Sequence, residues 1–146
     1  MKFYIATDHA GINYKDAVKK ILEARDIEVE DLGPYSTDRV DYPDYAQKCA
    51  NVVKADKGSF GILICGTGIG MSIAANKVTG VRAALCHDAY TAAMARAHNE
   101  AQILCFGERV LGLGTVESVI DAFLNTQPEG GRHEGRVEKI MAIENN

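Results

Sequence analysis

Short polar segments that contain ionisable side chains and glycines follow the apolar stretches of this 146-residue chain. Asp8-His9-Ala10-Gly11 follows the first stretch and Cys65-Gly66-Thr67-Gly68-Ile69-Gly70 follows a longer one, while His87-Asp88 and Gly107-Glu108-Arg109 follow two more. If the apolar stretches are parallel strands, their carboxyl ends meet at one edge of a sheet, which is where such sheets bind ligands. The sequence therefore predicts a site in which a carboxylate, an imidazole, a thiol, a glycine-rich loop and a guanidinium group converge.

The glycine-rich loop, residues 65–70, fails three known phosphate-binding patterns. A Walker loop ends in Gly-Lys-Ser/Thr, whereas Gly70 is followed by Met71-Ser72. A Cys-x5-Arg phosphatase loop needs Arg at position 71. A dinucleotide fingerprint needs Gly at that position and follows the first strand of its unit. The loop can still present several backbone N–H groups to an anion at a helix N-terminus. A tight strand-to-helix turn without a ligand is the alternative.

The thiol of Cys65 directly precedes the loop, beside the predicted N-terminus of the next helix. Helix N-termini favour the thiolate, which can act as nucleophile, metal ligand or general base. No second spaced ligand pair accompanies this thiol, so the roles of nucleophile and base remain. Cys49, Cys86 and Cys105 are interpreted as small buried hydrophobic residues.

His98 and Asn99 end a predicted helix, where the helix dipole favours a cation, so a protonated imidazole there suits a proton donor. A solvated capping residue is the alternative. A helix that follows a parallel strand runs back toward the opposite edge of the sheet, so His98 is expected to lie far from Cys65 within one chain. If both serve one reaction, His98 comes from a neighbouring chain, and we expect a dimer with shared sites.

Arg132 and Arg136 lie four residues apart on the last predicted helix, so their guanidinium groups share one face. Two such groups one turn apart suit a phosphate dianion. A solvated basic face is the alternative, and the nearby Glu134 and Glu138 favour it.

The elements that would position these groups alternate along the chain. Strands are expected at residues 3–6, 27–32, 60–65, 81–86 and 103–106, and helices at 14–25, 42–55, 71–77, 89–97, 116–124 and about 132–144. The last three strands are almost wholly apolar, as in strands buried on both faces of a parallel sheet, whereas the second is expected near an edge. The pattern predicts one α/β domain over residues 1–146, a Rossmann-like three-layer α/β/α sandwich with about five parallel strands.

Two of the predicted helices have an apolar side, and the sequence does not specify the surface against which each side packs. In residues 89–97 an apolar stripe of Tyr90, Ala93, Met94 and Ala97 indicates packing rather than a cofactor site. The extra C-terminal helix has an apolar side that is expected to cover its own sheet or a subunit interface.

The overall composition excludes several classes of function. Lys and Arg number 16 and Asp and Glu number 20, which gives a net charge of −4. That balance argues against a general nucleic-acid or anionic-membrane surface, so any bound anion must be held by a local cluster. No stretch approaches the ~20 apolar residues of a membrane span, and the first apolar run is too short for a secretory signal. The four cysteines form no C-x-x-C pair and are expected to be reduced thiols in the cytoplasm.

Taken together, these residues make the sequence similar to the ribose-5-phosphate isomerase B family, which also contains galactose-6-phosphate isomerase subunits. The resemblance is carried over nearly the whole chain, in the family's order, by residues 6–11, 39–43, 65–70, 74–77, 98–99 and 129–133. It implies an aldose–ketose isomerase without metal or cofactor that interconverts ribose 5-phosphate and ribulose 5-phosphate. It also implies a homodimer, often paired into tetramers, with sites between subunits.

The resemblance also implies a role for each candidate residue. One branch of the family uses a Glu in the glycine loop as base and the other a Cys at the strand end; here the loop position holds Met71, so Cys65 is the expected base. His98 would protonate the ring oxygen while Asp8 accepts or orients the C1 hydroxyl, and Cys65 would then move the C2 proton to C1 through a cis-enediolate. The N–H groups of the loop, with the hydroxyl of Thr67, would stabilise the oxyanion. The implied substrate-binding residues are Asp8, His9, Gly66, Thr67, Gly68, Ile69, Gly70 and Asn99, together with Arg109, Arg132 and Arg136, which with His9 would hold the phosphate.

Two alternatives remain open. The first is isomerisation of a six-carbon substrate such as galactose 6-phosphate or allose 6-phosphate, although the Arg132/Arg136 pair and the complete catalytic set in one chain favour the pentose. The second is a nucleotide-binding module without catalysis, which would bind adenine nucleotides tightly and would be indifferent to the loss of Cys65.

Overall fold

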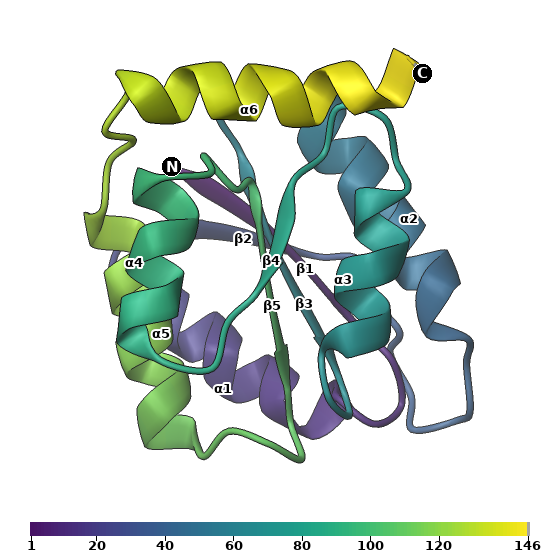
Figure 1. The fold of residues 1–146 in the computed structure, drawn as a ribbon. Helices are drawn as coiled ribbons and strands as arrows, with labels where there is room; N and C mark the ends of the chain where they lie inside the picture. Colours follow the sequence, from purple (N-terminus) through teal and green to yellow (C-terminus); the bar gives the residue numbers. More distant parts are fainter. Residues whose placement is uncertain (146) are drawn as a thin grey trace.

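The computed structural model describes residues 1–145 and shows strands alternating with helices along the chain (Figure 1). The strands are β1 (Lys2–Thr7), β2 (Glu28–Asp31), β3 (Phe60–Cys65), β4 (Ala83–Leu85) and β5 (Ile103–Gly107). The helices are α1 (Ile12–Glu23), α2 (Tyr42–Ala55), α3 (Ile69–Asn76), α4 (Ala89–Ala97), α5 (Leu113–Asn125) and α6 (Arg132–Ala142), followed by a 3-10 turn at Ile143–Asn145. Each expected element occurs, with some ends displaced by a few residues.

The five strands form one parallel sheet in the order β2-β1-β3-β5-β4. Helices α1, α4 and α5 cover one face of the sheet, and α2 and α3 cover the other (Figure 1). This confirms the predicted three-layer α/β/α sandwich and the edge position of the second strand. Because β1, β3 and β5 are neighbours, the loops that follow them lie side by side.

The alternation of side chains along β3 decides where its last residue points. Ile62 and Ile64 are buried in the hydrophobic cluster beneath α1, α4 and α5, whereas Leu63 and Cys65 belong to the cluster beneath α2 and α3. Cys65 ends the strand, so its side chain emerges on the face covered by α3, next to the first turn of that helix.

The prediction that residues 81–86 form a strand buried on both faces is wrong. The strand is limited to Ala83–Leu85, lies at the edge of the sheet and is only partly buried. Its outer side is covered by a side chain instead of another strand, because the amide of Asn76 donates to the carbonyl of Ala83 and accepts from the N–H of Ala83. A short apolar edge strand is thereby closed against further pairing.

The prediction for the packing face of α4 is also wrong in part. Tyr90 is 72% exposed, and the helix instead buries Ala92 and Ala95 where it lies against α5. Small alanine side chains let the two helices approach closely, whereas Tyr90 is exposed and Met94 is half-buried.

Helix α6 lies across the end of the sheet where the strands begin, opposite the carboxyl ends of β3 and β5 (Figure 1). Its apolar side covers this end only in part: Val137 is buried, whereas Ile140 is 42% and Ile143 is 66% exposed. Within residues 1–145, no helix combines the length and apolar character that a bilayer span requires.

Candidate active site

An open cleft of about 470 Å³ lies at the carboxyl ends of β1, β3 and β5. Its lining residues are Asp8, His9, Ala10, Tyr42, Cys65, Gly66, Thr67, Ile69, Gly70, Ile73 and Arg109. The structure therefore brings together the carboxylate, imidazole, thiol, glycine-rich loop and guanidinium group that the sequence analysis placed at one sheet edge. Gly68, which also belongs to the glycine-rich loop, is buried and does not line the cleft.

The thiol of Cys65 is held at the N-terminus of α3. Its sulfur accepts a hydrogen bond from the backbone N–H of Gly68 at 3.1 Å, and the residue lines the cleft although it is only 5% exposed. A donor aimed at the sulfur, together with the positive end of a helix, favours negative charge on it. The environment of this thiol is therefore suited to a base or a nucleophile.

The other three thiols lie in apolar surroundings. Burial raises the pKa of Cys49 to about 12 and that of Cys86 to about 11, and it raises the pKa of Cys105 well above its ordinary value. This agrees with their interpretation as small buried hydrophobic residues, because a thiol that resists ionisation is a poor nucleophile.

The glycine-rich loop turns directly into α3. Gly68 adopts a φ of 81°, and a Cβ there would lie 2.7 Å from the backbone carbon of Phe106, so position 68 has room for no side chain. The first backbone hydrogen bond of α3 runs from the N–H of Ser72 to the carbonyl of Gly68. The N–H group of Gly70, a residue that lines the cleft, therefore has no acceptor within the helix and can bind an anion.

Asp8 and His9 are fixed by backbone groups on the other side of the cleft. Oδ1 of Asp8 accepts from the N–H groups of Ala10 at 2.8 Å and Gly11 at 3.0 Å. Nδ1 of His9 accepts from the N–H of Val40 at 3.2 Å. A neutral His9 therefore carries its proton on Nε2 and can donate it to a ligand oxygen, and Oδ2 of Asp8 is left to accept from a ligand hydroxyl.

Arg109 is exposed in the cleft, and its loop is tied to the strand that carries the thiol. The N–H of Arg109 donates to the carbonyl of Gly66, and the N–H of Glu108 donates to the carbonyl of Cys65. The carboxylate of Glu108 accepts in turn from the N–H of Tyr14 at 2.9 Å, near the start of α1. Glu108 thus joins the loops after β1 and β5, a role that sequence reasoning did not assign to it.

Tyr42 is a second residue of the cleft that sequence reasoning did not include. It begins α2, is 40% exposed, and its ring lies so close to the loop that a Cβ at position 70 would come within 2.3 Å of it. A side chain at position 70 would therefore displace the Tyr42 ring from its place beside the loop. The signal was present in the sequence, since residues 39–43 lead into a helix at the same sheet edge.

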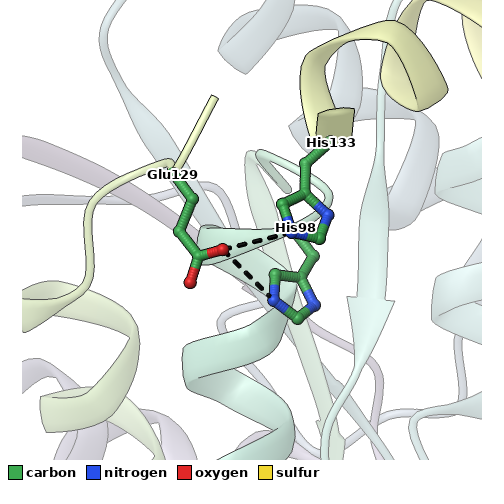
Figure 2. Close-up of side chains that lie close together, drawn as sticks. All are labelled: His98, Glu129 and His133. Carbon is green, nitrogen blue, oxygen red and sulfur yellow. Dashed lines mark ion pairs between the residues drawn. The ribbon is translucent and has the colours of Figure 1, made fainter. Parts of the chain in front are cut away.

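Other predicted site residues form a second group at the opposite end of the sheet. His98 caps the C-terminus of α4, and its Nε2 lies 3.5 Å from Oε2 of Glu129, which also lies 3.1 Å from Nε2 of His133 (Figure 2). The two imidazole rings are stacked, with centroids 4.0 Å apart and planes 8° apart. Burial and the neighbouring His98 lower the pKa of His133.

The two histidines and Glu129 offer atoms of types that bind metal ions, all within 4.8 Å of one another. Lone pairs of Nε2 lie in the plane of each ring, and two nearly parallel planes do not direct these lone pairs to one point. The stacked arrangement instead suits the ion pairs with Glu129 (Figure 2).

Asn99, Arg132 and Arg136 are exposed on the same side of the molecule as His98, because Asn99 follows α4 and the two arginines lie on α6. None of these three residues, nor His98, lines the cleft that contains Cys65. A single chain thus presents the predicted site residues in two groups at opposite ends of the sheet.

The chain is similar throughout its length to sugar-phosphate isomerases. The family model described as Ribose/Galactose Isomerase matches residues 3–140. Ribose-5-phosphate isomerase B of Escherichia coli is 47% identical over 143 residues, which cover 98% of this chain and 96% of that protein.

Solved structures agree with this. Ribose-5-phosphate isomerase B of Clostridium thermocellum has a TM-score of 0.97 and 48% identity over 99% of this chain and 98% of its own. The enzyme of Mycoplasma genitalium, solved with bound ribulose-5-phosphate, has a TM-score of 0.94 and 43% identity over 99% of this chain and 97% of its own.

The contrast among the four thiols predicts selective alkylation. With pKa values of about 12 and about 11, Cys49 and Cys86 have a thiolate fraction below roughly one in a thousand near neutral pH. Iodoacetamide added to the native protein is therefore expected to modify Cys65 first, as measured by mass spectrometry of peptides over time. A Cys65→Ser chain should remain unmodified over the same period. Equal or faster modification of a core cysteine in the folded protein would contradict this assignment.

Proposed function

Because this chain belongs to the ribose/galactose isomerase family, we propose that it is an aldose–ketose isomerase that interconverts ribose 5-phosphate and ribulose 5-phosphate. The observation that carries the proposal is the thiol of Cys65, hydrogen-bonded at the N-terminus of α3 and facing a cleft that also contains His9 and Arg109. The relative from Mycoplasma genitalium, which holds ribulose-5-phosphate, supports this choice of substrate.

The reaction needs three kinds of group. Moving a proton from C2 to C1 beside a carbonyl requires a base, donors that stabilise the oxyanion of the enediolate, and an anchor remote from the reacting carbons. The substrate is neither oxidised nor reduced overall, so the proton transfer balances without a cofactor. The base must be a reduced thiol, which suits a cytoplasmic enzyme.

Cys65 is the proposed base. Its thiolate takes the proton from C2 and returns it to C1 of the cis-enediolate. The N–H groups of the loop from Gly66 to Gly70 stabilise the oxyanion, with the hydroxyl of Thr67 beside them. The same helix end favours both the thiolate before the transfer and the enediolate after it.

The proposed phosphate anchor combines residues from both groups. Nε2–H of His9 and the guanidinium group of Arg109 supply donors from within the cleft. Arg132 and Arg136 add two guanidinium groups one helical turn apart, which suit a phosphate dianion. The net charge of the chain is −4, so the positive charge that holds the phosphate is supplied by this local cluster.

Ring opening requires a proton donor, and this role falls to His98. In the proposed mechanism His98 protonates the furanose ring oxygen, Asp8 accepts from the C1 hydroxyl through Oδ2, and Asn99 binds sugar oxygens. The ion pair with Glu129 and the stacked ring of His133 hold the imidazole of His98 in place. His98 caps the C-terminus of α4 and Cys65 ends β3, and these two element ends lie at opposite ends of the sheet (Figure 1). The complete proposed site therefore needs two copies of the chain in a homodimer, which can pair further into a tetramer.

A panel of sugar phosphates tests the function directly. Purified protein is expected to convert ribose 5-phosphate with a kcat/KM well above its values for galactose 6-phosphate and allose 6-phosphate. Formation of the ketose product is followed by absorbance or by coupled assay. A higher kcat/KM with either hexose phosphate would reassign the substrate. Tight binding of adenine nucleotides with no turnover of any sugar phosphate would instead identify a nucleotide-binding module.

Replacement of the proposed base separates catalysis from binding. Cys65→Ala is expected to lower kcat by ~10²–10⁴ or more, because general-base assistance is lost. The Kd for ribose 5-phosphate should change little, since the phosphate anchor is intact. Cys49→Ala serves as the matched control, because it removes a thiol from the core and should leave kcat per folded molecule unchanged. Retention of turnover by Cys65→Ala would remove this residue from its role.

Mixed dimers test the shared site. Cys65→Ala and His98→Ala chains, each inactive alone, are refolded together, so that a mixed dimer contains one site with both intact residues. Random pairing should restore roughly a quarter of the wild-type activity, because half of the dimers are mixed and each has one complete site. If mixed dimers form and remain inactive, both residues act within one chain.

A further inference from the structure

A small cavity separate from the active-site cleft lies at the beginning of β1 and β3, beside the C-terminal ends of α4 and α5. Its volume is about 190 Å³, and its main lining residues are Phe3, Phe60, Arg96, Phe123, Leu124 and Gln127. None of its lining residues lines the cleft that contains Cys65.

Arg96 is the unusual residue of this cavity. It is only 9% exposed, yet no carboxylate within residues 1–145 forms an ion pair with it. One of its five N–H groups is accounted for, because Nη1 donates to the carbonyl of Ala101 at 2.8 Å. Desolvation lowers the pKa of this guanidinium group, whereas the charge of Glu100 acts in the opposite direction. The N–H groups of Arg96 that lack a protein acceptor are not fully buried, so an anion in the cavity can reach them, and this charge pair would be screened less than one on the open surface.

The side chains that form the walls of the cavity indicate which kind of group the ligand carries beside its anionic group. The guanidinium carbon of Arg96 lies 4.6 Å from the centroid of the Phe60 ring and 5.5 Å from that of Phe123. Phe3 stacks on Phe60 with centroids 5.4 Å apart, and the Phe60 and Phe123 rings meet edge to face at 5.8 Å. Stacking on Phe60 leaves the N–H edge of the guanidinium group free to bind a carboxylate in its plane. Arg96 and Phe3 already occupy the faces of the Phe60 ring, so the apolar wall consists of ring edges and the side chain of Leu124. A flat apolar body can pack against such a wall, and a cavity of about 150 Å³ is already large enough for benzene.

We propose that this cavity binds a small aromatic carboxylate, with its carboxylate paired to Arg96 and its ring packed against the phenylalanine side chains. A free phosphate ion fits the site poorly, because most of the wall is apolar and would offer that dianion few donors in exchange for its water. The cavity shares no lining residue with the cleft that contains Cys65, although Arg96 lies on α4 two positions before His98.

Calorimetric titration of the full-length protein with benzoate tests this proposal. Benzoate is expected to bind one site per chain, and benzyl alcohol, which keeps the ring and lacks the charge, should bind at least about tenfold more weakly, as expected for loss of a charge-assisted hydrogen bond. A saturating concentration of inorganic phosphate should leave the Kd for benzoate unchanged, because phosphate occupies the active-site arginines instead.

Two substitutions locate the binding. Gln127→Glu places a carboxylate at the exposed rim of the cavity, where it competes for Arg96 and repels benzoate, so the Kd should rise at least about tenfold. Asn125→Asp is the matched control, because it adds the same charge at an exposed position outside this cavity and should leave the Kd unchanged. Arg96→Lys keeps the charge but loses the planar pair of donors, and it too should weaken binding.

Three results would overturn the proposal. They are the absence of benzoate binding at millimolar concentrations, displacement of benzoate by phosphate, and a Kd that Gln127→Glu and Asn125→Asp affect equally. Because position 127 is exposed, the first substitution does not depend on whether a change at the buried Arg96 allows the chain to fold.

Discussion

The hydrogen bond from the N–H of Gly68 to the sulfur of Cys65 is the interaction on which the site depends. It exists because β3 ends where α3 begins, with no more than a short glycine turn between them, so the last side chain of the strand meets the first free N–H groups of the helix. Gly68 makes this possible through its positive φ, and the backbone of Phe106 leaves no space for a side chain there. In the proposed mechanism, the same positive helix end stabilises two negative charges in turn, first that of the thiolate and then that of the enediolate.

A parallel sheet sets a second constraint, because it has two chemically different ends. The loops after the strands gather Asp8, His9 and Arg109 at one end, whereas the helices that return from them deliver His98 and α6 to the other. No rotation of a side chain can span the length of a strand, so one chain cannot close this set of groups around one small sugar. Opposite ends of two chains can face each other in a twofold dimer, so the proposed division of roles between the two groups of residues calls for a second copy of the chain.

Much of the fold follows from local sequence, and the exceptions have physical causes. The apolar stretch at β3 and the Pro43 at the start of α2 determine their elements almost to the residue. Composition alone does not distinguish an edge strand from a central strand. The apolar composition of β4 therefore predicts a buried strand, whereas in the structure the side chain of Asn76 covers its outer side. The packing face of α4 depends on how closely α5 approaches, which favours Ala92 over Tyr90. The roles of Tyr42 and Glu108 cannot be predicted from local sequence, because their contacts join segments far apart in the chain. Tyr42 lies beside Gly70, and Glu108 accepts a hydrogen bond from the N–H of Tyr14.

The proposed division of the phosphate anchor between two copies would couple substrate binding to association of the chains. A monomer would offer a phosphate only His9 and Arg109 in the cleft, while Arg132 and Arg136 would remain solvated on α6. A sugar phosphate that contacts both sets binds the dimer more tightly than the monomer, and by reciprocity it stabilises the dimer by the same free energy. The apolar side of α6 lies beside these arginines and is only partly covered, because Ile140 and, in the turn that follows the helix, Ile143 are exposed. This apolar surface could be buried when two chains associate. The position of α6 across the end of the sheet therefore links subunit contact to anion recognition within a single helix.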